Sequence, residues 1–355
     1  MKYQKTKKCM ALWKVIVIDL LVLGVILLTF ALFHHVLPKV ISEYRWKQAQ
    51  LNATEPVQTQ APETEIPEET VPNPETEPAT EPDPRTPWQI KYQDHFTDEV
   101  VVTDNSYTSQ ELAITIDKVE DTIGGRKVTY YVADIYIASL DNFKTYTAYG
   151  DVIYYGMQDA IGMVRDTDAI LAINGDYMTV QRTGFLVRNG EVFVSDQNNS
   201  ICVLYPDGSI ETYDRATYDI AEILARDPQQ VWSFGPRLLN DQGQAIESFE
   251  LSSGIAGNHP RTALGYYEPG HYCFVVVDGR QSGYSAGVTI VELAKIFEDL
   301  GCAAAYNMDG GQSSIMTFGE AYYNRPYANG RELGDILYLA ESGMYTHAKT
   351  QEDAE

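Results

Sequence analysis

The pattern of apolar and polar residues divides the chain into segments, and the first long apolar run predicts a membrane segment. Val15 to Phe33 is an almost unbroken apolar run, with Asp19 as its one charge, and is long enough to cross a bilayer as a helix. No signal-peptidase-like site follows it, which favours an uncleaved signal-anchor. Because lysines precede the run, we predict a cytoplasmic basic tail at 1–14 and a single-pass transmembrane anchor at 15–37, with the rest of the chain extracellular at the cell membrane.

The next segment, residues 38–87, has no apolar periodicity and is rich in Pro, Glu and Thr. Nine of the sixteen prolines fall between Pro56 and Pro87, a composition that cannot bury a core and predicts an extended, disordered linker. The other end of the chain, residues 346–355, is polar and predicts a flexible acidic tail. One folded domain at 88–345 is left between them.

Within this domain, short β-branched and aromatic runs separated by turns predict strands. Asn189-Gly190 and Asp207-Gly208 are typical hairpin turns. The continuous apolar run Tyr272 to Val277 suits the centre of a sheet. The predicted strands are Leu112 to Val119, Val128 to Ile137, Ala169 to Ile173, Phe185 to Arg188, Glu191 to Val194, Ile201 to Tyr205, Ile210 to Tyr213, Thr262 to Tyr267, Tyr272 to Val277, Ala303 to Tyr306 and Gly334 to Ala340.

Helical spacing is clearest after Thr289. Thr289 and Glu292 form a capping-box pair, apolar residues then recur at helical intervals, and Gly301 ends the helix. Weaker helical patterns occupy 157–166 and 217–226. The fold class that follows is α+β, a mixed β-sheet core with about three helices, preceded by one transmembrane helix and a disordered linker.

Charge and cysteine content exclude several functions. The formal net charge of −24 argues against nucleic acid as a partner, because a binder needs a basic face. The cysteines beyond the anchor, Cys202, Cys273 and Cys302, have neither disulfide-framework nor zinc-site spacing, and Cys202 and Cys273 are expected to be buried. The histidines show no metal-binding spacing, so we expect no metal and no cofactor.

Polar clusters stand at the ends of several predicted strands, where loops commonly carry binding and catalytic groups. In isolation, Asp309-Gly310-Gly311 is typical of a tight hairpin turn. The clusters are Asn174-Gly175-Asp176, Phe234-Gly235-Pro236-Arg237, His259-Pro260-Arg261-Thr262, Asp278-Gly279-Arg280-Gln281 and Asn307-Met308-Asp309-Gly310-Gly311.

Taken together, these clusters come in an order and spacing that resembles the phosphodiester glycosidase (NAGPA-domain) family. Further strings that carry the resemblance are Gly184 to Gly190, Gly283 to Thr289, and Ser313-Ser314 after the two glycines. The resemblance covers about residues 107–342. It implies hydrolysis of a sugar-1-phosphate diester between the anomeric carbon and the phosphate oxygen, with a phosphodiester-linked glycan as substrate.

For that chemistry, Asp309 and Asp278 are the favoured catalytic carboxylates, with Asp176 third, because glycosidic cleavage usually employs two. Positive charge should stabilise the phosphate leaving group, preferably through an arginine fork. The candidate substrate-binding residues are Arg261, Arg280, Gly310, Gly311 and Ser313 for the phosphate, Asn174 and Asn307 for sugar hydroxyls, and Ser314 without a more specific role.

Other interpretations stay open at this point. Gly283-Tyr284-Ser285-Ala286-Gly287 fits the G-x-S-x-G string of serine esterases, with Asp309 and His347 later in the chain, but the strand before it stops too early for a nucleophile elbow. A non-catalytic domain that binds wall glycans is the second alternative. A calcium site from the three aspartates lacks EF-hand spacing.

Overall fold

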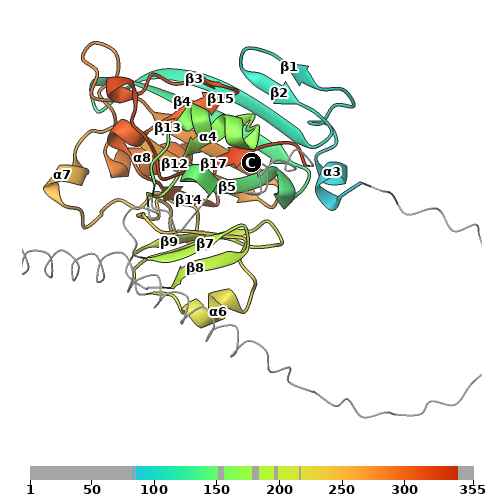
Figure 1. Cartoon of the computed structure of the whole chain (residues 1–355). Coiled ribbons are helices and arrows are strands. Elements are labelled where there is room, and N and C mark those ends of the chain that lie inside the picture. The colour runs from blue at the N-terminus through green and yellow to red at the C-terminus, as the bar shows by residue number, and fades with distance from the viewer. Residues whose placement is uncertain are drawn as a thin grey trace, which may run out of the picture. The chain divides into compact units, whose positions relative to one another are not determined.

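Three antiparallel sheets form the core of the part of the chain that the structure, a computed structural model, describes (Figure 1). The described residues are 83, 85–150, 156–177, 184–195, 199–215 and 217–342, all within one compact unit, Glu81–Glu355. The predicted basic tail, membrane anchor, most of the linker, the acidic tail and His347 lie outside them. Among the described helices, none is both long and apolar enough to cross a membrane.

The large sheet has seven strands in the order β1 (Val101–Val102), β2 (Ser106–Thr108), β3 (Leu112–Ile123), β4 (Arg126–Ile137), β13 (His271–Val277), β12 (Arg261–Glu268) and β14 (Ala304–Asn307). The second sheet has five, in the order β10 (Ile210–Tyr213), β9 (Ile201–Leu204), β11 (Gln230–Trp232), β7 (Phe185–Arg188) and β8 (Glu191–Ser195). The third sheet also has five, in the order β16 (Ala321–Tyr322), β15 (Met316–Phe318), β6 (Leu171–Asn174), β17 (Asp335–Leu339) and β5 (Phe143–Thr147).

The α+β class is confirmed, with two differences from the prediction. Every strand pairing recorded for the described residues is antiparallel, so the sheets are not mixed. The described residues contain five α-helices rather than about three, because two one-turn helices have no apolar periodicity to reveal them. The five are α3 (Pro87–Lys91), α4 (Ala160–Thr167), α6 (Ile220–Leu224), α7 (Ser253–Ala256) and α8 (Ile290–Asp299).

The strand β13 shows how the layers are built. It pairs with β4 on one side and β12 on the other, which confirms its predicted place inside a sheet. Tyr272, Phe274 and Val276 face a core shared with both smaller sheets, whereas the alternate residues Cys273 and Val275 pack with α8. Both faces of the strand are therefore buried, as its continuous apolar sequence requires.

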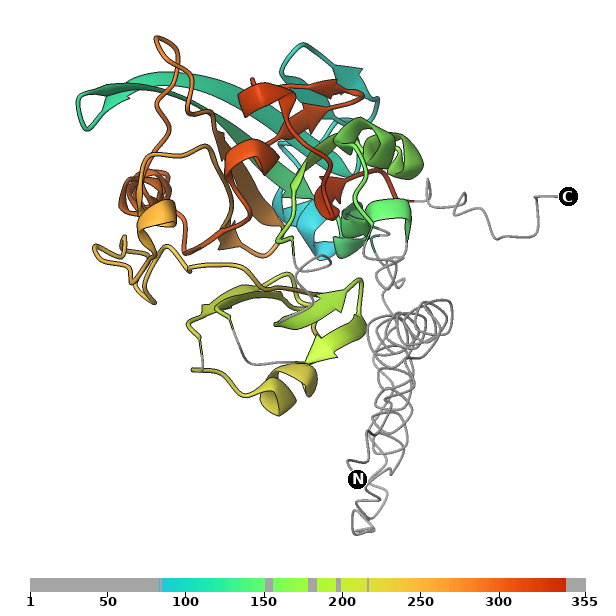
Figure 2. The ribbon, with the colours of Figure 1, turned by 60° about the vertical axis from the view of Figure 1, so that its left-hand side comes forward.

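Three helices cover the outer faces. The predicted capping box at Thr289 and Glu292 begins α8, which packs on the large sheet. α4 packs on the third sheet and α6 on the second sheet, the lower layer in Figures 1 and 2. Cys202 and Cys273 are buried, as expected.

Strand register brings the predicted polar clusters to one side of the core. Arg261 at the start of β12 pairs with Val277 at the end of β13, and Ala263 pairs with Asn307 at the end of β14. In the third sheet, Asn174 at the end of β6 pairs with Ile336, near the start of β17. The loops after β6 and β14, which belong to different sheets, are joined directly by a hydrogen bond from the Asp309 N–H to the Gly175 carbonyl oxygen.

Candidate active site

The loop after β14 is tied to the loop after β6 by two hydrogen bonds. The Asp309 backbone N–H donates to the Gly175 carbonyl oxygen at 3.2 Å, and the Asn174 Nδ2 donates to the Asp309 carbonyl oxygen at 2.7 Å. The Asn174 Nδ2 also reaches the Gly175 carbonyl oxygen, while its Oδ1 accepts from Thr262 Oγ1 and the Ile315 N–H. This buried amide uses all four of its hydrogen-bonding positions within the protein.

The Asp309 carboxylate is oriented from two directions. Its Oδ1 accepts from the Gly310 N–H at 2.8 Å, and its Oδ2 accepts from Arg331 Nη2 at 2.6 Å. The Arg331 Nε also donates to Ser313 Oγ at 2.5 Å, and its guanidinium lies 4.9 Å from the ring centroid of Tyr177. The Asp309 side chain keeps 14% of its surface exposed. One arginine therefore joins a reachable carboxylate to a hydroxyl on the same turn.

The two glycines after Asp309 do not form a hairpin turn. Gly311 opens a 3₁₀ turn, Gly311–Ser313, with a φ of +70° that suits glycine. Its N–H donates to the Pro260 carbonyl oxygen at 2.9 Å, and the Gly310 N–H is used by Asp309. A Cβ on Gly311 would lie 3.3 Å from Arg280 Nη1, so the glycine admits that guanidinium.

The two predicted phosphate-binding arginines have different surroundings. Arg261 is buried and donates to the carbonyl oxygens of Val288, Ile255 and Gly257, and burial together with Arg280 lowers its pKa to about 10. Arg280 is exposed, and its Nε and Nη2 face His259 Nδ1 at 3.2 and 3.1 Å. Arg261 stays cationic at neutral pH, and of the two arginines only Arg280 faces solvent.

Asp278 lies behind this loop, buried at the end of β13. Its Oδ1 accepts from Asn324 Nδ2 at 2.8 Å, and its Oδ2 accepts from the Tyr284 hydroxyl at 2.8 Å and the Arg325 N–H at 3.0 Å. Burial raises the pKa of Asp278, while hydrogen bonds from Asn324, Tyr284 and the Arg325 N–H oppose that rise.

Ser285, the centre of the esterase-like string, is fully buried. Its hydroxyl donates to the Asp278 carbonyl oxygen at 2.5 Å and accepts from the Thr129 N–H at 3.0 Å. The preceding strand ends at Val277, so the serine does not stand on a strand-to-helix elbow. This geometry gives Ser285 a structural role and does not support the esterase alternative.

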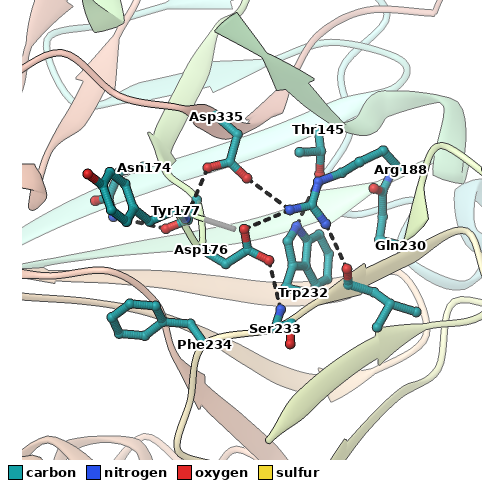
Figure 3. Close-up of polar contacts among 12 residues, drawn as sticks. Thr145, Asn174, Asp176, Tyr177, Arg188, Gln230, Trp232, Ser233, Phe234 and Asp335 are labelled. Carbon is teal, nitrogen blue, oxygen red and sulfur yellow. Dashed lines mark hydrogen bonds and ion pairs between the residues drawn. The ribbon is translucent and has the colours of Figure 1, made fainter. Parts of the chain in front are cut away.

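Asp176 belongs to a buried ionic network that joins two sheets (Figure 3). Its Oδ1 accepts from Arg188 Nη2 at 2.7 Å, and its Oδ2 accepts from the Ser233 N–H at 2.7 Å. The same Arg188 nitrogen donates to Asp335 Oδ2 at 3.0 Å. All three charged side chains are at most 2% exposed. Gly175 fits beside them because a Cβ there would lie 2.4 Å from the Asp335 carboxylate.

Two predicted substrate-binding residues carry buried oxygen atoms without a hydrogen-bond partner among the described residues. The Asn307 Nδ2 donates to the Gly235 carbonyl oxygen at 2.8 Å, but its Oδ1 has no such partner. The Ser314 Oγ is also buried and has no hydrogen-bond partner among the described residues. In the described part of the chain, no group of three or more His, Cys, Asp or Glu residues is placed to hold a metal ion.

Comparison with known proteins identifies the family of the part of the chain that contains the site. Residues 167–340 match the phosphodiester glycosidase family, and this range contains all the candidate site residues. The chain carries a phosphodiester glycosidase domain. The prediction of a domain of this hydrolase family is therefore confirmed.

Two solved structures are similar to this chain in fold. The catalytic domain of zebrafish N-acetylglucosamine-1-phosphodiester alpha-N-acetylglucosaminidase, auto-inhibited by its pro-peptide, shares the fold with a TM-score of 0.56 and 18% identity, over 68% of this chain and 88% of that one. A hypothetical protein from Synechocystis has a TM-score of 0.51 and 14% identity, over 68% and 64% of the two chains.

A sequence relative is the SPbeta prophage-derived uncharacterized protein YomE of Bacillus subtilis (strain 168), which is 25% identical over 182 residues. That match covers 48% of this chain and only 28% of YomE, so the two proteins share a part of their lengths.

Three charged residues of the glycosidase domain were not among the predicted site residues. Arg188 lies in the Gly184 to Gly190 string that carries the family resemblance, and it ends a predicted strand before an Asn-Gly turn, where a charge usually meets solvent. Asp335 begins an apolar strand, and Arg331 lies in a loop with no motif. A charge inside or beside an otherwise apolar strand was the available signal for Arg188 and Asp335, whereas nothing in the sequence marked Arg331.

The buried network makes stability depend on pH. Burial, together with the neighbouring Asp176, raises the pKa of Asp335 from 3.8 to about 7. The folded chain therefore keeps a proton that the unfolded chain loses, and the free energy of unfolding falls as pH rises from about 4 to 7. Denaturant titrations at several pH values give the free energy of unfolding as a function of pH. We expect the slope of this dependence between pH 4 and 7 to be less negative in Asp335→Asn than in the wild type. Asp141→Asn, an exposed control, should leave the slope unchanged; equal slopes for wild type and Asp335→Asn would contradict this expectation.

Proposed function

We propose that the protein hydrolyses a sugar-1-phosphate diester at the bond between the anomeric carbon and the phosphate oxygen, in a cell-surface glycan or exopolysaccharide. The observation that carries this proposal is the Asp309 carboxylate, held by Arg331 at 2.6 Å and followed by a glycine turn that admits Arg280. A carboxylate for the sugar and a fixed cation for the phosphate are the two groups that the reaction needs.

Asp309 is the carboxylate that we place at the anomeric carbon. It is the most exposed of the three candidates: its side chain is 14% exposed, whereas Asp278 and Asp176 are at most 1% exposed. Arg331 and the Gly310 N–H fix its orientation, so that it can act as nucleophile, acid or base without first reorganising. Asp278 and Asp176 hold the neighbouring loops in this scheme, and Asn174 fixes the backbone at Asp309.

Arg280 is the residue that we assign to the phosphate. His259 occupies its Nε and Nη2, which leaves Nη1 on the side of Gly311. A phosphate leaving group departs as an anion and needs little protonation, so the fixed charge replaces a second acid. Buried Arg261 supports the proposal indirectly. It donates to the carbonyl oxygens of Ile255 and Gly257, in the loop that leads to His259, and His259 contacts Arg280.

Sugar hydroxyls are the groups that we assign to Asn307 Oδ1 and Ser314 Oγ. Both atoms are buried and lack a hydrogen-bond partner in the described chain, and an unmade hydrogen bond at a buried polar atom costs free energy. A bound sugar would supply the missing donors and acceptors.

Asp309→Asn tests the catalytic assignment. The amide keeps the shape of the side chain but can serve neither as nucleophile nor as acid or base, so we expect kcat to fall at least roughly a hundredfold. The measurement is release of free sugar from a panel of sugar-1-phosphate diesters, followed by NMR. Asp141→Asn is the matched control, and near-normal turnover by Asp309→Asn would remove Asp309 from the mechanism.

We also propose that residues 15–37 anchor the protein in the cell membrane, with residues 1–14 inside and the glycosidase domain outside. The apolar run and its preceding lysines support this topology. Full-length protein should resist alkaline carbonate extraction from membranes, and deletion of residues 15–37 should release the domain. Extraction of both forms alike would refute the anchor.

A further inference from the structure

Three arginines beside the candidate active site each lie over a tyrosine ring. The guanidinium of Arg280 lies 5.5 Å from the ring centroid of Tyr327, Arg325 lies 4.9 Å from Tyr284, and Arg331 lies 4.9 Å from Tyr177. We call these three arginines the arginine rim. Aromatic faces hold a guanidinium in place by cation–π attraction without neutralising its charge.

The arginine rim is continuous with the turn that carries Asp309. Arg280 approaches Gly311 from one loop, and Arg331 donates to Ser313 on the same 3₁₀ turn. The third member, Arg325, is joined to the Arg280 loop because Gln281 Nε2 donates to the Arg325 carbonyl oxygen at 2.8 Å. The Arg325 N–H in turn donates to Asp278. The three arginines therefore lie on loops that are joined to one another or to the turn after Asp309 by hydrogen bonds or close contacts.

The charge of the rim is unusual for this protein. The chain carries 50 acidic and 26 basic residues, yet within the described residues no carboxylate forms an ion pair with Arg280 or Arg325. Both side chains are exposed. By contrast, Arg226, which also lies over a tyrosine ring, is paired with Glu211. Exposed guanidinium groups held on rings suit planar, two-point recognition of phosphate.

One scissile phosphate does not account for three arginines. Arg280 suffices for the leaving group, and Arg331 is engaged with Asp309, which leaves Arg325 without a role in the cleavage of a single diester. We propose that the arginine rim binds further phosphates of the same substrate, so that the preferred substrate is a glycan chain in which phosphodiesters repeat. This inference rests on the proposed function and names its substrate class.

Binding of inorganic polyphosphate of about ten units tests the arginine rim, and the sugar need not be known. The reference is binding of orthophosphate at the same total phosphate concentration. We expect full-length protein to bind polyphosphate at least roughly tenfold more tightly per phosphate in calorimetry, because linked charges bind together. The preference should shrink with added salt. Arg325→Gln should remove most of it, and Arg325→Lys, which keeps the charge, should recover part of it.

Arg226→Gln is the matched control, since it removes a ring-stacked arginine from the second sheet, and it should bind polyphosphate like the wild type. The proposal would be overturned by equal affinity for polyphosphate and orthophosphate, or by equal losses in Arg325→Gln and Arg226→Gln. Failure of the proposed function would look different: no monomeric sugar-1-phosphate diester would release sugar, whatever the calorimetry gave.

Discussion

The candidate active site depends on one buried cation. Arg188 on β7 of the second sheet donates to Asp335 on β17 and to Asp176 after β6, both in the third sheet or directly after it. A buried charge is tolerated only when it is paired, and the loss of one partner of such a pair typically costs about 3–5 kcal/mol. The two sheets are therefore fixed to each other at the point where the polar loops begin.

The positions of the loop after β6 and of Asp309 depend on that contact. Asp176 and Asp335 fix the loop after β6, where Gly175 leaves room for the Asp335 carboxylate. Gly175 and Asn174 then hold the backbone of Asp309. The carboxylates of the site thus differ in burial: Asp176, Asp278 and Asp335 are buried and hold the loops, whereas Asp309 is partly exposed. This difference fits the proposed function, in which only the partly exposed carboxylate meets the substrate.

Local sequence signals predicted most of the fold. Short β-branched and aromatic runs and hairpin turns located the strands, and the Thr289–Glu292 capping box located α8, because these features depend on neighbours in the chain. The helices α3 and α7 are too short to carry such a signal. Polar clusters at strand ends also identified the loops that meet. The partners that fix them did not follow from sequence, since Arg188 and Asp335 lie 147 positions apart and only the sheet arrangement brings them together.

The central claim concerns which bond breaks, and hydrolysis in water enriched in oxygen-18 tests it most directly. A sugar-1-phosphate diester that the full-length protein turns over would be hydrolysed in labelled water, and both products would be analysed by mass spectrometry. Attack at the anomeric carbon, as proposed for Asp309 and Arg280, places the label in the freed sugar and none in the phosphate monoester. Label in the phosphate would show cleavage between phosphorus and oxygen, and would contradict the account.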